Sequence, residues 1–287
     1  MDWLHAIALG VTQGLTEFLP VSSSGHLIIV PWLFRWDEPG LAFDAALHLG
    51  TLIAVLLYFW RDIVGLIAAL PTAVRNPHLA FSDPSPRDST DTQHARLVLL
   101  LIIGCIPGGI AGLLLQNTID DFFHDAAHCD RAIVIIAILL IVFAVLLFLA
   151  DRFAQGDRKI SQMTIRDAIV VGLAQSLAVF AGTSRSGVTL TAGLASGVRR
   201  ADAARFSFLL DAPIIAAAGL QGVVRLIKDG SEEIGSTKLI VAVLVSAITG
   251  ALAISGLMRY LQRASTTVFV VYRIAMGVAV IALVIYR

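Results

Sequence analysis

The chain has 287 residues, of which 57% are hydrophobic and 15% charged, and its formal net charge is zero. A soluble domain usually carries about 25% charged residues, so this composition predicts a membrane protein. A nucleic-acid partner is excluded, because phosphate backbones select for a clustered basic excess that this chain lacks.

In chain order, the first feature is a polar segment at residues 10–26, too broken by Gly, Ser and Pro to be one spanning helix. Gln13 and Glu17 are four residues apart, so they share one face of a helix. That helix should end near Pro20, because the residue before a proline avoids the α region. A carboxylate inside a membrane is costly, so Glu17 predicts a functional site.

Six downstream stretches are long enough to cross the roughly 30 Å hydrocarbon core. Four are almost wholly apolar: residues 97–115, 132–150, 239–258 and 268–286. The other two carry polar residues, Asp44 and His48 within residues 41–60, and Ser207 and Asp211 within residues 206–225. These two spans are expected to face protein or water rather than lipid.

A second polar segment, residues 172–187, repeats the first one 162 residues later. The identical pairs are Gly10/Gly172, Gln13/Gln175, Leu15/Leu177, Phe18/Phe180, Ser22/Ser184, Ser24/Ser186 and Gly25/Gly187. When the offset is increased by one residue, His48 aligns with Asp211. The pattern predicts one transmembrane domain, residues 1–287, built by duplication, with repeats over about residues 1–115 and 165–287.

Loop charges predict that the two repeats are inverted, since basic loops stay in the cytoplasm. The basic segments after residues 60 and 150 and the clusters at 199–205 and 259–263 are expected inside. So is a flexible loop at residues 76–94, which is rich in Pro, Ser and Asp. The acidic segment 117–130 and the segment around Glu232 and Glu233 are expected outside.

In this topology the chain enters and leaves each polar segment from the same side of the membrane. This arrangement predicts a re-entrant hairpin whose irregular backbone lines a cavity. Hairpins entering from opposite faces would meet near the midplane. The expected fold is an all-α polytopic membrane protein with inverted-topology repeats, about six full transmembrane helices and two re-entrant helical hairpins.

Small polar residues in both hairpins favour phosphate binding. Ser22, Ser23, Ser24 and Gly25 begin a helix, where free backbone N–H groups attract anions, although serine-rich turns are also common helix caps. The second copy adds Arg185, whose guanidinium can hold phosphate oxygens bidentately.

Three further ionisable residues are candidates. His26 is expected to shuttle a proton or to attack phosphorus. His48 and Asp211 either line the cavity or bond to a local hydroxyl or backbone group, and Ser207 is the expected partner of Asp211.

These motifs resemble the undecaprenyl-diphosphatase family of the bacitracin-resistance type, over essentially the whole chain. The resemblance lies in an E/Q-x-x-x-E motif at residues 13–17, in FLPVSSSGHL at residues 18–27 and in AGTSRSG at residues 181–187. It implies hydrolysis of undecaprenyl diphosphate to the monophosphate and inorganic phosphate. This reaction recycles the carrier lipid of peptidoglycan synthesis and confers bacitracin resistance.

The resemblance also implies a location and partners. The protein would be a multi-pass protein of the bacterial cytoplasmic (inner) membrane, with a site that opens to the periplasmic or outer face. A polyprenyl diphosphate lipid and the bilayer are the expected partners, a divalent cation, Mg²⁺ or Ca²⁺, is the expected cofactor, and a homodimer is compatible with this assignment.

Residue by residue, the resemblance implies catalytic roles for Glu17, Ser23 and His26, with Glu17 also a candidate metal ligand. The nucleophile stays open between Ser23, His26 and a water activated by Glu17. The expected diphosphate-binding residues are Arg185, Ser184, Ser186, Ser22, Ser24 and Gln13.

Two positions depart from the family pattern. Gln13 stands in place of a carboxylate and cannot act as a general base. Ala181 stands in place of the usual proline, so the second hairpin is expected to be less sharply broken.

The alternative function is a secondary transporter or flippase for a phosphorylated polyprenyl lipid, because inverted repeats with broken helices are also transporter architecture. A carrier would not require an acid, a hydroxyl and an imidazole together beside Arg185. A purely structural membrane protein would leave Glu17 and Arg185 unexplained. Hydrolysis is therefore the favoured function.

Overall fold

A computed structural model describes residues 2–37, 40–85, 88–124, 129–153, 156–229 and 236–286. Within these ranges the regular structure is helical, apart from one isolated β-bridge. The α-helices are α1 (Trp3–Phe18), α2 (Ser23–Phe34), α3 (Leu41–Tyr58), α4 (Trp60–Arg75), α5 (Thr90–His124), α6 (Cys129–Phe153), α7 (Ile165–Ser176), α8 (Arg185–Ala195), α9 (Arg200–Asp229), α10 (Ser236–Tyr260) and α11 (Thr267–Tyr286).

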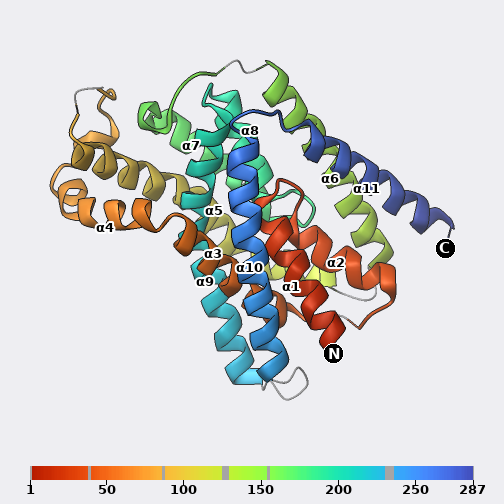
Figure 1. The fold of residues 1–287 in the computed structure, drawn as a ribbon. Coiled ribbons are helices and arrows are strands. Elements are labelled where there is room, and N and C mark those ends of the chain that lie inside the picture. Colours follow the sequence, from red (N-terminus) through yellow and green to blue (C-terminus); the bar gives the residue numbers. More distant parts are fainter. Residues whose placement is uncertain are drawn as a thin grey trace.

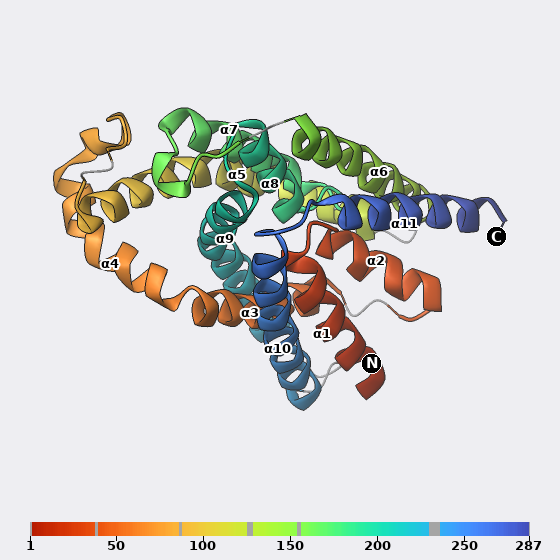
Figure 2. The same cartoon turned by 45° about the horizontal axis from the view of Figure 1, so that its top comes forward.

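The described helices α5, α6, α9, α10 and α11 are each long and apolar enough to cross a membrane. The pair α3 and α4, bent by 82°, is either a sixth, broken span or a re-entrant loop. The prediction of an all-α polytopic membrane protein is therefore confirmed. Figures 1 and 2 show α6 and α11 side by side at one edge of the molecule, with α4 extending away at the opposite edge.

Helices α1 and α2 form the first helical hairpin. Asp2 caps α1, because its carboxylate accepts a hydrogen bond from the His5 N–H at 2.8 Å. The helix ends at Phe18, since Leu19 precedes Pro20 and is extended, with a ψ of 139°. The chain then turns back into α2, so the predicted helix end near Pro20 is confirmed.

Helices α7 and α8 form the second hairpin. A 3₁₀ turn, Leu177–Val179, follows α7, and Phe180 is then extended, with a ψ of 122°. The α-helix ends here although Ala181 stands where the family pattern has a proline. The additional 3₁₀ turn makes this break more gradual than the one in the first hairpin, as expected.

The first identical pair of the repeat, Gly10 and Gly172, allows each hairpin to pack closely on a long helix. α1 lies against α10, and α7 lies against α5. A Cβ atom at Gly10 would lie 2.6 Å from the carbonyl oxygen of Ala242, and one at Gly172 would lie 2.5 Å from that of Gly104. Only glycine permits such approaches, so the two packing arrangements are equivalent.

The structure corrects the expectation of a loop directly after Trp60. These residues form α4, whose buried Ala69 and Ala73 pack against Ala95 and Val98 of α5. A helix forms here because small apolar residues recur on one face, which the neighbouring helix covers.

Two predicted loops are also shorter than expected. Within residues 76–94 a 3₁₀ turn forms at Pro77–Ala80, and α5 already begins at Thr90. In the acidic segment 117–130, α5 continues to His124. Residues 125–128, together with Glu232 and Glu233, lie outside the described residues.

Segments predicted to share the cytoplasmic side lie together at one end of the helices. Arg200, at the start of α9, pairs with Asp151 near the end of α6, and the Thr266 N–H before α11 donates to that carboxylate at 2.7 Å. Arg205 pairs with Asp62 of α4. These contacts agree with the grouping that the loop charges predict.

Candidate active site

A cavity of about 180 Å³ lies beside the two hairpin tips, among α2, α3, α5 and α9. Its small and apolar lining includes Leu27, Ile28, Gly112 and Ala218. Its polar lining includes Glu17, Ser23, Ser24, His48, Ser184 and Arg185. A cavity that is polar in one part and apolar in the other suits an amphiphilic ligand.

The hairpin tips have equivalent geometry. Ser22 and Ser184 both have positive φ angles, 78° and 72°, which is uncommon for residues other than glycine. Their Oγ atoms accept hydrogen bonds from the N–H groups of Gly25, at 3.3 Å, and Gly187, at 3.1 Å. These two serines therefore act as helix caps.

Serine hydroxyls also join one tip to the other. Ser22 Oγ accepts a hydrogen bond from the Gly182 N–H at 3.1 Å, and Ser186 Oγ donates to the Leu19 carbonyl at 3.1 Å. Ser22 and Ser186 are thus occupied in holding the tips together, whereas Ser24 and Ser184 line the cavity.

Arg273 on α11 secures the same junction. Its guanidinium is fully buried and donates to the carbonyls of Pro20, at 3.2 Å, and of Gly182 and Thr183, both at 3.0 Å. A fourth bond reaches the Leu140 carbonyl at 3.1 Å. The site prediction missed Arg273, although a lone charge within an apolar span was a signal for it.

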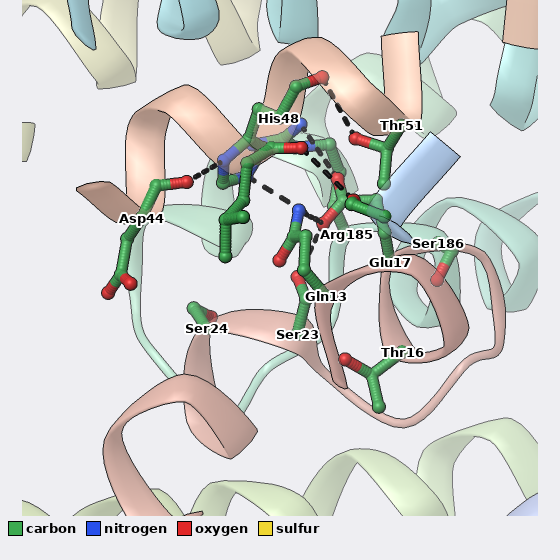
Figure 3. Close-up of polar contacts among 12 residues, drawn as sticks. Gln13, Thr16, Glu17, Ser23, Ser24, Asp44, His48, Thr51, Arg185 and Ser186 are labelled. Carbon is green, nitrogen blue, oxygen red and sulfur yellow. Dashed lines mark hydrogen bonds and ion pairs between the residues drawn. The ribbon is translucent and has the colours of Figure 1, made fainter. Parts of the chain in front are cut away.

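Glu17 lies at the centre of the polar part of the cavity (Figure 3). Ser23 Oγ donates to its Oε2 atom at 2.5 Å, and Gln13 Nε2 donates to the same atom at 3.1 Å. His48 Nε2 lies 3.7 Å from Oε2, and Arg185 Nη1 lies 3.6 Å from Oε1. A hydroxyl, an amide, an imidazole and a guanidinium therefore surround one buried carboxylate.

Arg185 is the first residue of α8 and so lies at the N-terminus of that helix. Its Nη1 atom is buried and receives no hydrogen-bond partner from the described residues. Since Arg185 also lines the cavity, its guanidinium and the helix N-terminus are both directed at an anion-binding position.

His48 supplies the imidazole of the cavity. Its Nδ1 atom lies 2.8 Å from the Asp44 carbonyl oxygen, which can only accept, so Nδ1 carries a proton. Nε2 is left facing Glu17. Asp44 also lines the cavity and was missed as a site residue, although its position within an apolar span was noted.

The structure does not bring His26 to this cluster. Its Nδ1–H donates to the Ser22 carbonyl at 2.6 Å, and its Nε2 lies 2.7 Å from the Tyr272 hydroxyl on α11. Ser23, Ser24 and Leu27 line the cavity from one face of α2, and helical spacing directs His26 away from that face.

Asp211 is also buried outside the cavity lining. Its expected partner, Ser207, pairs instead with the Thr189 hydroxyl at 2.5 Å. Gln13 likewise stands behind Glu17 and does not line the cavity. Gln175, the repeat partner of Gln13, does line it and was not predicted as a site residue.

A divalent cation fits this cavity only together with a substrate. The described residues contain no group of three His, Cys, Asp or Glu side chains that could hold a metal ion. Mg²⁺ often uses only one or two protein carboxylates when substrate phosphates supply other ligands. Glu17 fits the role of such a single carboxylate.

Comparison with known proteins gives matches along the whole chain. The family model described as bacitracin resistance protein BacA matches residues 6–279. A Thermomicrobium roseum protein named undecaprenyl-diphosphatase is 46% identical over 284 residues, covering 99% of both chains. A protein of the same name from Geobacter sulfurreducens is 43% identical over 100% of both chains, and one from Moorella thermoacetica is 42% identical over 98% of both.

Proposed function

The chain belongs to the bacitracin resistance protein BacA family, and on that premise we propose that it hydrolyses undecaprenyl diphosphate to undecaprenyl phosphate and inorganic phosphate. The supporting observation is the Ser23 hydroxyl, hydrogen-bonded to the Glu17 carboxylate at 2.5 Å. Beside it lies Arg185 Nη1, which pairs with Glu17 at 3.6 Å and has no hydrogen-bond partner among the described residues. The names of the full-length relatives support the same activity.

Binding is mainly a matter of charge and position, as is usual for phosphoryl transfer. Arg185, Ser184 and Ser24 hold the diphosphate, together with the N–H groups at the starts of α2 and α8. A divalent cation shared with Glu17 would offset further negative charge. The prenyl chain follows the apolar lining into the bilayer, and each buried methylene contributes about 0.8 kcal/mol.

Ser23 is the nucleophile in this proposal. Its oxygen bonds to the terminal phosphorus as the bond from that phosphorus to the bridging oxygen breaks, and the hydroxyl proton passes to Glu17. Undecaprenyl phosphate leaves with the bridging oxygen. Water then attacks the phosphoserine and releases inorganic phosphate, while the serine oxygen regains a proton. His48 Nε2, 3.7 Å from Glu17, can relay protons to the cavity.

The cavity is proposed to open to the outer face of the bacterial cytoplasmic membrane. It is lined by Asp44 near the start of α3 and by Gln116 and Phe123 of α5, at helix ends that the loop charges assign to the outside. Hydrolysis there would return the carrier lipid to peptidoglycan synthesis and confer resistance to bacitracin. The homodimer stays a prediction, which the mass of the purified protein in detergent would check.

Phosphate release from farnesyl diphosphate by purified protein with Mg²⁺ tests the proposed activity. We expect one inorganic phosphate per farnesyl monophosphate formed. Glu17→Gln should lower kcat by about 10²–10⁴-fold, as loss of a general base does, and Arg185→Met should mainly raise KM. Folded wild-type protein that releases no phosphate but moves a phosphorylated prenyl lipid between vesicle leaflets would instead support the flippase alternative.

A further inference from the structure

Gln175 of α7 has no role in the chemistry derived above. In the first repeat its counterpart, Gln13, donates to Glu17, four residues further along the same helix. Four residues after Gln175 the chain has Val179, so the second repeat offers no equivalent carboxylate. Gln175 is 2% exposed, and neither its Nε2 nor its Oε1 atom has a hydrogen-bond partner among the described residues.

An unpaired amide is unfavourable in such a position. Burying a polar group without a partner destabilises a protein, whereas an apolar side chain of the same shape avoids the loss. The surroundings nevertheless accommodate the amide closely, since a Cβ atom at Gly108 would lie 2.6 Å from Gln175 Nε2. The packing of α5 on α7 therefore holds a polar group without a partner at the cavity wall.

The cavity identifies the missing partner. Gln175 lines it together with Ser184 and Arg185, which are placed to hold a diphosphate. In a prenyl diphosphate only the diphosphate can accept a hydrogen bond from Nε2, because the hydrocarbon chain has no acceptor. We propose that Gln175 is a diphosphate-binding residue, whose Nε2–H donates to a phosphate oxygen. This inference rests on the proposed function for the identity of the ligand.

The test measures binding of inorganic pyrophosphate with Mg²⁺ to the purified protein by calorimetry, alongside the Tm of the ligand-free protein. Gln175→Met keeps an unbranched side chain but removes the amide. We expect an unchanged or higher Tm without ligand and a Kd that rises on the order of tenfold, the loss of one hydrogen bond to a charged group. The KM for farnesyl diphosphate should rise by a similar factor, and kcat should fall less.

Two further variants sharpen the test. Gly108→Ala places a methyl group against the amide and should weaken pyrophosphate binding in the same direction. Gln262→Met makes the same chemical change at an exposed position outside the cavity and should leave Kd unchanged.

A Gln175→Met protein that binds pyrophosphate as tightly as wild type, or a lower Tm with unchanged affinity, would overturn the inference and leave hydrolysis intact. Wild-type protein that binds no pyrophosphate would overturn it too. Wild-type protein that binds pyrophosphate through Gln175 but hydrolyses no prenyl diphosphate would support the contact and refute the proposed activity.

Discussion

Replacing Arg273 with methionine should destabilise the protein strongly, because one buried guanidinium holds both hairpin tips. It donates to four carbonyls at 3.0 to 3.2 Å, three of them in the tips. Leu140 lies within α6, where its carbonyl also accepts the intrahelical hydrogen bond, so the loss falls on the three tip carbonyls. Each buried acceptor left without a donor costs about 1–3 kcal/mol, so the lower limit for three acceptors is about 3 kcal/mol. Such a loss is at or above the upper end of the usual range of about 0.5–3 kcal/mol for a single substitution.

Urea unfolding of detergent-solubilised wild-type and variant protein measures this loss, with phosphate release measured in parallel. Arg273→Met should lower both stability and kcat, since the tips that carry Glu17 and Arg185 are no longer joined. Arg259→Met, at an exposed arginine of α10, is the control and should change stability by no more than about 0.5 kcal/mol. An Arg273→Met protein with wild-type stability and kcat would refute the conclusion that Arg273 holds the two hairpin tips together.

Three further predictions follow from other contacts. Tyr272→Phe should destabilise the protein by about 1–2 kcal/mol, because it leaves His26 Nε2 unpaired, and it should keep kcat near wild type. A large loss of kcat at unchanged stability would mean that His26 takes part in the reaction. Burial raises the pKa of Asp167, but hydrogen bonds from Arg158 and Thr164 outweigh this effect and lower it below its ordinary value. A carboxyl whose pKa is lower in the folded state stabilises the protein at pH values above its unfolded pKa of about 3.9. The difference in Tm between wild type and Asp167→Asn should therefore persist at neutral pH and shrink below about pH 4. A Tm difference that does not change with pH would contradict this prediction. EDTA should stop phosphate release and Mg²⁺ or Ca²⁺ restore it, whereas full activity in EDTA would rule out a shared cation.

The scaffold was largely predictable because its signals are local. The proline at residue 20 ends α1, the apolar stretches set the spans, and the identical glycines at positions 10 and 172 mark close contacts between helices. Gln13 and Glu17 were correctly expected on one helix face. The bend after α3 was missed because its cause is non-local: α4 turns away from α3 to bury its alanines on α5.

The candidate site was less predictable because side-chain direction depends on packing between distant elements. His26 neighbours the tip serines in sequence, but the helix directs it to Tyr272, and His48 from α3 faces Glu17 instead. The repeat alignment identified Gln175 as the counterpart of Gln13, but it could not show that the Gln175 amide has no hydrogen-bond partner among the described residues. That follows only from the three-dimensional structure, in which Gly108 and the cavity surround the amide.

The pairing of Ser23 with Glu17 is the central claim, and single-turnover hydrolysis of farnesyl diphosphate tests it most directly. We expect Ser23→Ala and Glu17→Gln to fold with a Tm close to that of wild type, and Ser23→Ala to keep a pyrophosphate affinity within a few-fold of wild type. Both should lower the single-turnover rate by at least about 10²-fold, the minimum for loss of a positioned proton acceptor or its donor. A folded Ser23→Ala protein that hydrolyses the substrate at the wild-type rate would contradict the account.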